Sequence, residues 1–269
     1  MSALSPVPNP AETYEQYLVP AMFAPMAVKL VARAAPHAGE HVLDLACGTG
    51  IVARRVAPLV TPDGHVDALD LNPVMLSEAR NAAAREEVEI AFHDGNMEAV
   101  PFPDDAYDLV TCHQGLQFAP NRPTAVSEMR RVLAAGGRVV VGCWGALADQ
   151  PLSAKLAPII AQHVGAPVFD VPFSLGDVDK LRALFIAAGF SDVQLETVSH
   201  TTRFPHPDRY VAMLVDGIIA GIPSMQQLSP EARQQLVAAL RVDIDPVVRD
   251  ATVGGEIVSP MQTHIVTAR

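Results

Sequence analysis

An acid and two glycines early in the chain have the types and spacing of a ligand-binding loop. Asp44 lies in an apolar run that leads into Gly48-Thr49-Gly50, and residues 51–56 follow with helix-forming character. This order predicts a strand, a tight turn and a helix. Because glycine has no side chain, a ligand can touch the backbone of the turn, and the free amides of the first helical turn point to the same place. We therefore expect a ligand on this loop.

The loop spacing alone is compatible with two kinds of ligand. Gly48, Gly50 and Ala53 match the dinucleotide pattern G-x-G-x-x-A, and Asp70 lies at the distance expected for an acid that binds a ribose. Asp44 argues against a dinucleotide, because a buried carboxylate beside the loop would repel a pyrophosphate. S-Adenosylmethionine has no phosphate and carries an ammonium and a sulfonium, which the same carboxylate attracts. The sequence thus favours the cationic cofactor.

The stretch VLDLACGTG at residues 42–50 resembles the cofactor-binding motif of the class I S-adenosylmethionine-dependent methyltransferases. Three later segments are similar to other motifs of that family and occur in the same order: ALDLN at 68–72, HDGNME at 93–98 with Pro101-Phe102 after it, and LAAGGRV at 133–139. The resemblance covers about residues 40–145. Within the family, the chain most resembles the subfamily related to the ubiquinone and menaquinone C-methyltransferases.

The resemblance implies a role for each residue around the cofactor. Asp70 would accept from both ribose hydroxyls, Asp94 would accept from the adenine amino group, and Met97 would pack on the adenine and offer its backbone amide. Asp70 could instead cap the next helix, although Asn72 is better placed for that task. Asn96 stands where relatives have a small apolar residue. The expected cofactor-binding residues are Tyr14, Asp44, Gly48, Thr49, Gly50, Asp70, Leu71, Asp94, Gly95, Asn96, Met97, His113 and Gln114.

Polar side chains follow the expected strand at 106–113. His113, Gln114 and Gln117 lie where that strand ends, and ligands of open α/β sheets bind outside the carboxyl ends of the strands. We expect His113 to be the catalytic residue, because an imidazole can take a proton from an acceptor hydroxyl or amine near neutral pH. The alternative is a histidine that only lines the site around the carboxyl end of the cofactor.

Aromatic residues are the remaining candidates for the site. Trp144, the only tryptophan, ends an apolar strand and either walls an acceptor pocket or closes the core. Tyr14 and Tyr17 lie on an expected N-terminal helix, which the resemblance places over the cofactor; simple packing on the core is the alternative. We assign Tyr14 to the cofactor, and Tyr17, Gln117 and Trp144 to the substrate pocket.

Apolar runs alternate with helical patterns along most of the chain. Pro20 and Pro25 are expected to break the helical stretch 11–35, and Asp245-Pro246 and Gly221-Ile222-Pro223 to divide the insertion 206–250 into short helices. We expect strands at 42–46, 65–70, 88–93, 106–113, 138–144, 192–204 and 256–267, and helices starting at 51 and spanning 72–86, 123–134, 148–164 and 178–189.

The order of these elements resembles an α/β, Rossmann-like, doubly wound fold. We expect a mostly parallel seven-stranded sheet with an antiparallel last strand and a helical cap. The expected parts are an N-terminal helical lid at 1–35, a cofactor-binding core at 36–204 and 251–269, and a helical cap insertion at 205–250.

Composition limits the class of protein. The 269 residues include 19 Lys and Arg against 30 Asp and Glu, a formal net charge of -11, which is the wrong balance for binding a phosphate backbone. Cys47, Cys112 and Cys143 lack Cys-x-x-Cys spacing, so we expect reduced thiols in the core and no metal site. The first ten residues do not resemble a secretory signal and no uninterrupted apolar run has membrane-spanning length. We therefore expect a cytoplasmic protein without membrane insertion or nucleic acid.

The expected reaction follows from the cofactor. Methyl transfer from a sulfonium is an in-line displacement, so the protein mainly has to align the acceptor and exclude water, without a triad or a metal. We expect methyl transfer to a small-molecule acceptor, quinone-like or a secondary metabolite, with S-adenosylhomocysteine as the product. A non-methylating reaction such as a cyclisation and a regulatory binding protein remain alternatives, and a homodimer and the nature of the methylated atom are left open.

Overall fold

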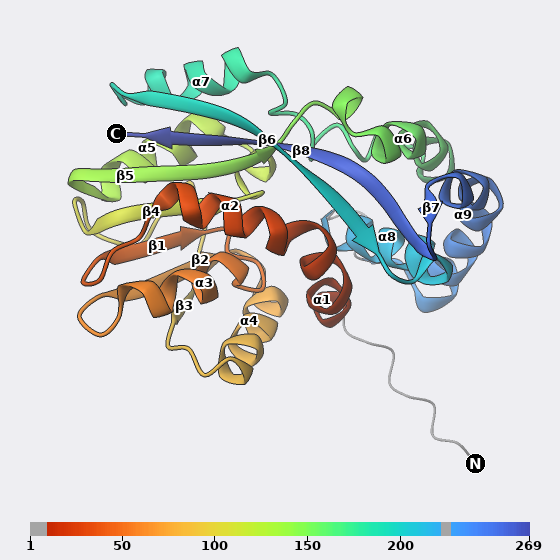
Figure 1. Cartoon of the computed structure of the whole chain (residues 1–269), viewed down its shortest axis with the longest axis horizontal. Helices are drawn as coiled ribbons and strands as arrows, with labels where there is room; N and C mark the ends of the chain where they lie inside the picture. Colours follow the sequence, from red (N-terminus) through yellow and green to blue (C-terminus); the bar gives the residue numbers. More distant parts are fainter. Residues whose placement is uncertain (1–9, 222–226) are drawn as a thin grey trace.

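The computed structural model describes residues 10–221 and 227–269, and its centre is one mixed sheet (Figure 1). The strand order is β3-β2-β1-β4-β5-β8-β6, with β7 paired to β8. Strands β3, β2, β1, β4 and β5 are parallel to one another, whereas β8 is antiparallel to both β5 and β6. The expected fold class is confirmed. The strands are β1 His41–Leu45, β2 His65–Asp70, β3 Ala91–Asp94, β4 Tyr107–His113, β5 Leu133–Trp144, β6 Val193–Phe204, β7 Thr252–Val253 and β8 Glu256–Ala268.

Helices cover both faces of this sheet. Successive side chains of β1 point to opposite faces, so Val42 joins a core cluster with Leu30 and Val56 while Leu43 joins another with Phe185. The helical elements are α1 Pro10–Thr13, α2 Ala24–Ala34, α3 Ile51–Val60, α4 Pro73–Arg85, α5 Arg122–Val132, α6 Pro151–Val164, α7 Val178–Ala187, α8 Pro207–Gly221 and α9 Pro230–Asp250, with the π-helix η1 Tyr14–Phe23 and the 3-10 turns η2 Leu116–Phe118 and η3 Leu147–Asp149.

The N-terminal helical stretch is continuous from Pro10 to Ala34, so the breaks expected at Pro20 and Pro25 are wrong. Pro20 lies inside η1, where the wider π-helical turn accommodates it. Pro25 lies in the first turn of α2, a position that needs no backbone N–H. The stretch therefore lies across the molecule as one curved helix, which Figure 1 shows in red and brown.

By length and composition, the stretch Pro10–Ala34 could cross a membrane, although no uninterrupted apolar run suggested this. Of its most apolar 18-residue window, 39% is buried inside the protein. Core helices of soluble proteins and signal sequences can have the same length and composition, so these two properties do not identify a membrane segment. Ala27, Leu30 and Ala34 pack fully buried in the core.

Helices α8 and α9 lie between β6 and β8, at the end of the molecule away from α7 (Figure 1). They form a third apolar cluster that includes Leu156 and Ile160 of α6 together with Leu240 and Ile244 of α9. Helix α6, which the sequence places with the core, therefore packs on α9. Helix α9 continues through Pro246, so the break expected there is wrong, and Ile222-Pro223 lies outside the described residues.

Strand β5 begins at Leu133, five residues before the expected start at Arg138. The Gly136-Gly137 pair lies inside this strand rather than before it, and the pairing with β4 shifts register between Tyr107 and Leu109. An irregular ladder of this kind tolerates glycine, because a bulge needs a residue without steric restriction. Gly136 has a positive φ of 84°.

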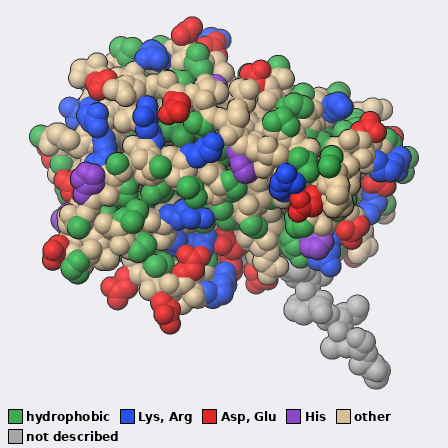
Figure 2. Space-filling model, viewed as in Figure 1, with side chains coloured by type: hydrophobic (Ala, Val, Ile, Leu, Met, Phe, Trp, Pro, Cys, Tyr) green, Lys and Arg blue, Asp and Glu red, His purple; other side chains and the backbone are tan. Residues whose placement is uncertain are grey.

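The surface in Figure 2 shows Lys and Arg side chains scattered among acidic and apolar ones. No basic patch gathers on this face. The distribution agrees with a net charge of -11 and gives no support to phosphate-backbone binding on this side.

Candidate cofactor site

The glycine loop joins β1 to α3 in left-handed backbone conformations. Ala46, Gly48 and Gly50 have φ values of 51°, 56° and 82°. A Cβ at Gly50 would lie 3.3 Å from the ring of Phe92, whereas a Cβ at Gly48 would meet nothing within 4 Å. Gly50 is therefore required by both its conformation and its close contact. The backbone at Gly48 faces open space, as a loop that binds a ligand requires.

Asp44 is 1% exposed and both of its carboxylate oxygens accept hydrogen bonds from the protein. Oδ1 accepts from the Thr111 hydroxyl at 2.8 Å, and Oδ2 accepts from the Ala53 amide at 3.1 Å. These bonds tie β1 to β4 and to the first turn of α3. Burial raises the pKa of Asp44 to about 7, with the charge of Asp70 a smaller cause. Asp44 thus shapes the loop directly.

Asp70 ends β2 and connects the glycine loop to the start of α4. Its Oδ2 accepts from the Gly48 amide at 2.7 Å and its Oδ1 from the Asn72 amide at 2.8 Å. Asp94, which is exposed, is its partner in the β2–β3 register. Burial raises the pKa of Asp70, and the nearby Asp94 carboxylate adds to the rise. Each Asp70 oxygen keeps a second lone pair, so the carboxylate can still accept from a ligand hydroxyl.

The residues that follow β2 and β3 differ in side-chain exposure and in their contacts. Leu71 is 66% exposed, as an apolar contact for a planar ring would be. Met97 is buried in the core cluster with Leu69, so its side chain is not presented beside Leu71. The Asn96 Oδ1 accepts from the Glu98 amide at 2.9 Å and stabilises the turn. Gly95 is required by packing, because a Cβ there would lie 2.7 Å from Leu69.

The protein leaves three buried polar atoms without a partner near these strand ends. They are Thr49 Oγ1 in the glycine loop, His113 Nδ1 at the end of β4 and Gln117 Oε1 in η2. An unpaired buried polar atom costs about 1–3 kcal/mol. Hydroxyl, imidazole and amide groups of this kind suit the amine, carboxylate and hydroxyls of S-adenosylmethionine, so the residues present fit that cofactor.

His113 is held by the N-terminal helix. Its Nε2 lies 3.2 Å from the Phe23 carbonyl oxygen, and because a carbonyl only accepts, Nε2 carries the proton and donates. Burial lowers the pKa of His113 to about 4. The imidazole is therefore neutral at pH 7 and a weak base. This geometry favours the lining role over the expected catalytic role, which stays a prediction.

Gln114 and Gln117 form a buried amide pair behind His113. The Gln114 Oε1 accepts from Gln117 Nε2 at 3.1 Å, and its Nε2 donates to the Thr263 hydroxyl at 3.3 Å. Gln114 has a positive φ of 60° that an ordinary side chain rarely adopts. The pair therefore links the end of β4 to β8.

An aromatic cluster covers this edge of the sheet. The Phe23 ring lies 5.0 Å from Tyr14 and 5.7 Å from Trp144, centroid to centroid. Trp144 is 5% exposed and packs with Met26 and Met261, so it closes the core as well as facing the lid. Burial and then the charge of Asp70 raise the pKa of the Tyr14 phenol.

Tyr17 lies elsewhere. Its hydroxyl accepts from Arg209 Nη1 at 2.8 Å, and its ring meets His206 edge-on at 6.2 Å. The structure therefore places Tyr14 against Phe23 in the aromatic cluster and Tyr17 against α8. The three-residue spacing of Tyr14 and Tyr17 did not predict this difference, because their contacts are with residues far apart in the sequence, Phe23 for one and Arg209 for the other.

An ion cluster attaches the N-terminal helix to the helix that follows the glycine loop. Arg54 on α3 is 4% exposed, and its Nη2 lies 2.6 Å from Glu15 Oε1 of η1. Its Nη1 contacts Glu86 beyond α4. Sequence reasoning missed Arg54, and also Thr111 and Phe23. A polar residue in the apolar strand β4 was a usable signal for Thr111; nothing comparable marked Phe23.

None of the three cysteines forms a disulfide bond. Cys47, Cys112 and Cys143 are free and buried, and burial raises the pKa of each thiol. Within residues 10–221 and 227–269 no group of three or more His, Cys, Asp or Glu has metal-binding geometry. The thiols therefore act as packing residues in this structure.

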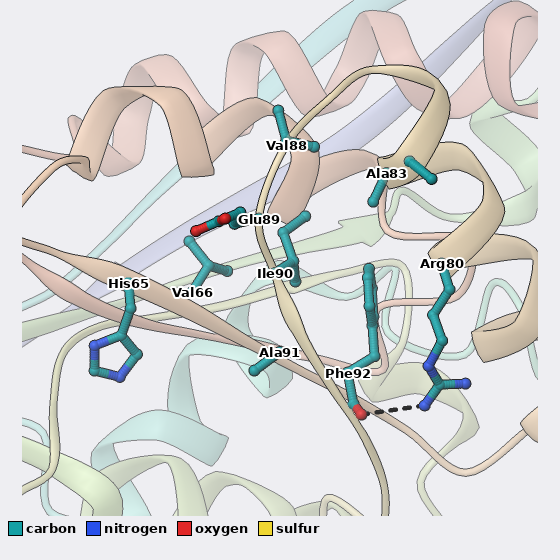
Figure 3. Close-up of a pocket in the computed structure, with 10 residues that line it drawn as sticks. His65, Val66, Arg80, Ala83, Val88, Glu89, Ile90, Ala91 and Phe92 are labelled. Carbon is teal, nitrogen blue, oxygen red and sulfur yellow. Dashed lines mark hydrogen bonds between the residues drawn. The ribbon is translucent and has the colours of Figure 1, made fainter.

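A groove of about 490 Å³ lies along β3 and α4, at the opposite end of β2 from Asp70 (Figure 3). Arg80 donates to the Phe92 carbonyl at 3.1 Å and lies over the Phe92 ring at 5.9 Å. None of the expected site residues lines this groove, so it is distinct from the glycine loop. Its lining residues are His65, Val66, Arg80, Ala83, Ala84, Val88, Glu89, Ile90, Ala91 and Phe92.

Comparisons with known proteins agree with this geometry. A family model described as a methyltransferase domain matches residues 42–137. Demethylmenaquinone methyltransferase of Halalkalibacterium halodurans is 32% identical over 178 residues, 60% of this chain and 71% of that protein. The C-methyltransferase UbiE of ubiquinone and menaquinone biosynthesis from Hahella chejuensis is 41% identical over 106 residues, 39% of this chain and 43% of that protein. The chain spans about two fifths of the length of the first curated relatives it matches.

Solved structures with a similar fold are also known. The YcgJ protein of Bacillus subtilis aligns over 90% of this chain and 96% of its own, with a TM-score of 0.60 and 20% identity, which shows a shared fold. The family is shown by the relatives that match in sequence. With the glycine loop, the acid pair at the ends of β2 and β3 and a relative matched over 71% of its length, this chain belongs to the class I S-adenosylmethionine-dependent methyltransferases.

Proposed function

We propose that this protein transfers a methyl group from S-adenosylmethionine to a small-molecule acceptor. The observation that carries the proposal is the position of Asp70. Its carboxylate accepts a hydrogen bond from the Gly48 amide, and Asp94 is its partner in the pairing of β2 with β3. Two adjacent carboxylates repel a pyrophosphate and accept readily from ribose hydroxyls and an adenine amino group. A cationic nucleoside therefore fits this edge better than a dinucleotide.

The cofactor, when bound, supplies an electrophilic methyl group on a sulfonium. The residues of this chain bind and orient it: Asp70 accepts from the ribose and the Gly48 backbone lets the ligand approach. Phe23 and Trp144 exclude water from the carboxyl edge of the sheet. Excluding water favours a displacement in which charge disappears from sulfur, and alignment supplies most of the acceleration.

His113 assists by position. In its neutral form it donates from Nε2 to the lid and presents Nδ1 as an acceptor. A methyl acceptor that is already nucleophilic needs no stronger base. We extend the proposal to a quinone-like or secondary-metabolite acceptor, supported by the names of the relatives, and to a cytoplasmic location, supported by three buried reduced thiols.

The test is calorimetric titration of the purified protein with S-adenosylmethionine, S-adenosylhomocysteine and NAD. We expect binding of the first two at micromolar concentrations and none of NAD. Binding of NAD alone would overturn the assignment.

The variant Asp70→Ala tests the residue that carries the proposal. We expect S-adenosylhomocysteine affinity to fall at least about tenfold, because the lost hydrogen bonds to a charged acceptor are worth about 1.5–3 kcal/mol. Asp179→Ala, an exposed acid in α7, is the matched control and should bind as the parent does. Thermal denaturation of each variant separates lost binding from lost folding, and unchanged affinity of a folded Asp70→Ala protein rules out the role.

A further inference from the structure

A buried carboxylate on β2 lies among side chains from other strands of the sheet. Asp67 is 9% exposed, and its Oδ1 lies 2.6 Å from His93 Nε2 of β3. Its Oδ2 lies 3.0 Å from the Tyr107 hydroxyl of β4 and 3.2 Å from His65 Nε2. Asp67 pairs with Leu43 in the register of β1 with β2, so the two side chains point to the same face of the sheet. The contacts of Asp67 join β2, β3 and β4 on that face.

The Asp67 carboxylate accepts a hydrogen bond on each oxygen. Because a carboxylate only accepts, His93 Nε2 carries a proton and donates to it, as the Tyr107 hydroxyl does. Burial, and then the charge and the hydrogen bond of Asp67, raise the pKa of Tyr107, so this phenol is a protonated donor at physiological pH. An apolar residue at position 67 would avoid the cost of burying a charge. The carboxylate instead fixes the direction of two side chains, which an apolar residue does not do.

Phe102 extends these contacts into the loop between β3 and β4. Its ring meets the His93 ring edge-on at 5.0 Å and the Tyr107 ring at 5.5 Å, centroid to centroid. Asp67, His93, Phe102 and Tyr107 thus form a closed ring of contacts, which we call the Asp67 cluster. Residues 94–101 lie between His93 and Phe102 in the sequence, so the cluster anchors this segment at both ends.

Strand β3 depends on side-chain contacts for its position, because it is short and lies at the edge of the sheet. It has four residues and pairs with β2 alone among the described strands, whereas β2 pairs with both β1 and β3. An element with fewer hydrogen-bonded neighbours is displaced more easily. Besides its pairing with β2, β3 receives a hydrogen bond from Arg80 to the Phe92 carbonyl at 3.1 Å and the contacts of the Asp67 cluster.

We propose that Asp67 positions residues 94–97 for recognition of the adenine ring of the cofactor, by holding His93, the residue that precedes them. The inference rests on the proposed function and adds a residue that contacts no ligand. Residues 94–97 are the segment that the sequence assigns to the adenine, and Asp94 pairs with Asp70 at the ribose side. Asp67 is thus a positioning residue that acts through β3.

Asp70 does not depend on the Asp67 cluster in the same way. Its two oxygens accept from the Gly48 and Asn72 amides, and it lies on β2, which has a neighbouring strand on each side. Loss of the Asp67 carboxylate releases His93 but leaves these bonds in place. The expected consequence is weaker recognition of the base with unchanged recognition of the ribose, which separates a positioning role from general destabilisation.

The test compares three ligands by calorimetry at pH 7.5: S-adenosylhomocysteine, S-inosylhomocysteine, in which an oxygen replaces the adenine amino group, and the 2′-deoxy analogue of S-adenosylhomocysteine. We expect the parent protein to bind each analogue about tenfold more weakly than S-adenosylhomocysteine, because each lacks one hydrogen-bond donor. In Asp67→Asn, an NH₂ group that donates replaces one accepting oxygen, so the preference over S-inosylhomocysteine should fall to about threefold or less. The preference over the 2′-deoxy analogue should stay about tenfold.

His93→Leu tests the same link from β3 and is the deciding variant if Asp67→Asn does not fold. It should lower the preference over S-inosylhomocysteine to the same extent, and adding Asp67→Asn to it should lower the preference no further, since one contact is lost in both. Asp108→Asn is the matched control, because this carboxylate is partly buried on β4 and accepts from the His41 amide at 2.9 Å. It should keep both preferences.

Thermal denaturation establishes that each variant is folded before its affinities are compared. A folded Asp67→Asn or His93→Leu protein that keeps the full preference over S-inosylhomocysteine overturns the inference. Equal loss of both preferences also overturns it, because that result indicates a general effect on β2. A parent protein that binds S-adenosylhomocysteine and S-inosylhomocysteine equally has no adenine contact to position, which again refutes the assignment. If the parent protein does not bind S-adenosylhomocysteine at all, the proposed function fails and this inference fails with it.

Discussion

At the scale of single residues, the site depends on carboxylates in unlike surroundings. Asp44 is enclosed by protein donors, whereas Asp70 has donors from the loop and lies near exposed Asp94. Both lie near the glycine loop, and burial raises the pKa of each. Asp44 is buried whereas Asp70 is partly exposed, so only Asp70 is accessible from solvent.

Asp44 should make stability depend on pH. Its pKa rises from 3.8 to about 7 on folding, so the unfolded chain ionises first and stability falls as pH rises from about 4 to about 7. At roughly 1.4 kcal/mol per pKa unit, the total is on the order of 4 kcal/mol. We expect Asp44→Asn to remove this slope in urea unfolding at pH 4.5, 6.0 and 7.5. A difference from the parent that stays constant across pH would refute this explanation.

His113 should remain neutral throughout the physiological range. Because burial lowers its pKa to about 4, its ring nitrogens should keep their neutral shifts in long-range proton–nitrogen spectra from pH 5 to 8, with the proton on Nε2. The variant His113→Asn assigns the signal among nine histidines by its loss. A titration midpoint near 6.5 would instead support the catalytic base expected from the sequence.

At the scale of elements, the lid is attached to the glycine-loop helix by one arginine. The Arg54 side chain is 3% exposed and that of Glu15 12%, so the pair is largely shielded from solvent. Removal of one member of a buried pair leaves the other without compensation. The position of η1 therefore depends on α3, the helix that follows the glycine loop.

Arg54→Met should loosen the lid. We expect a loss of about 3–5 kcal/mol in stability and faster hydrogen exchange over residues 10–23, because Glu15 is left buried and unpaired. Adding Glu15→Gln should restore part of both, which a double-mutant cycle measures. Arg249→Met, on an exposed arginine in the last turn of α9, is the control. Equal effects of the two arginine variants would contradict the proposed attachment.

The sequence predicted elements best where pattern and local chemistry agree. Strand β2 has the expected bounds, and α4 starts where Asn72 accepts from the Val74 and Met75 amides. Pro20 and Pro246 misled the prediction, because tertiary packing holds helices η1 and α9 through them. Met97 and Tyr17 show the same limit for the site: a motif gives the position of a residue but not the direction of its side chain.

At the scale of the whole molecule, β6 and β8 continue from the central sheet into the helical region (Figure 1). Their pairing extends without interruption from Val193 with Ala268 to Phe204 with Ile257. A continuous two-stranded ladder resists bending, so the core and the helical region should move as one body. We therefore expect the N-terminal helix to be the part that moves when the site opens.

This arrangement predicts where cofactor binding changes the protein. Saturation with S-adenosylhomocysteine should reduce hydrogen exchange in residues 10–34 and in the glycine loop, and leave the radius of gyration in solution unchanged. The measurements are hydrogen-exchange mass spectrometry and small-angle scattering. A marked decrease in the radius of gyration would indicate closure between the core and the helical region, contrary to the prediction.

The antiparallel partnership of β6 and β8 also bears on how the enzyme can diversify. Phe204 and Ile257 are paired neighbours, so the chain leaves the sheet for α8 and returns from α9 at almost the same point. A different helical segment grafted between these two residues would inherit a fixed anchorage, while Asp44, Asp70 and the glycine loop stay untouched. The helical segment can thus be exchanged without rebuilding the half of the chain that carries the glycine loop.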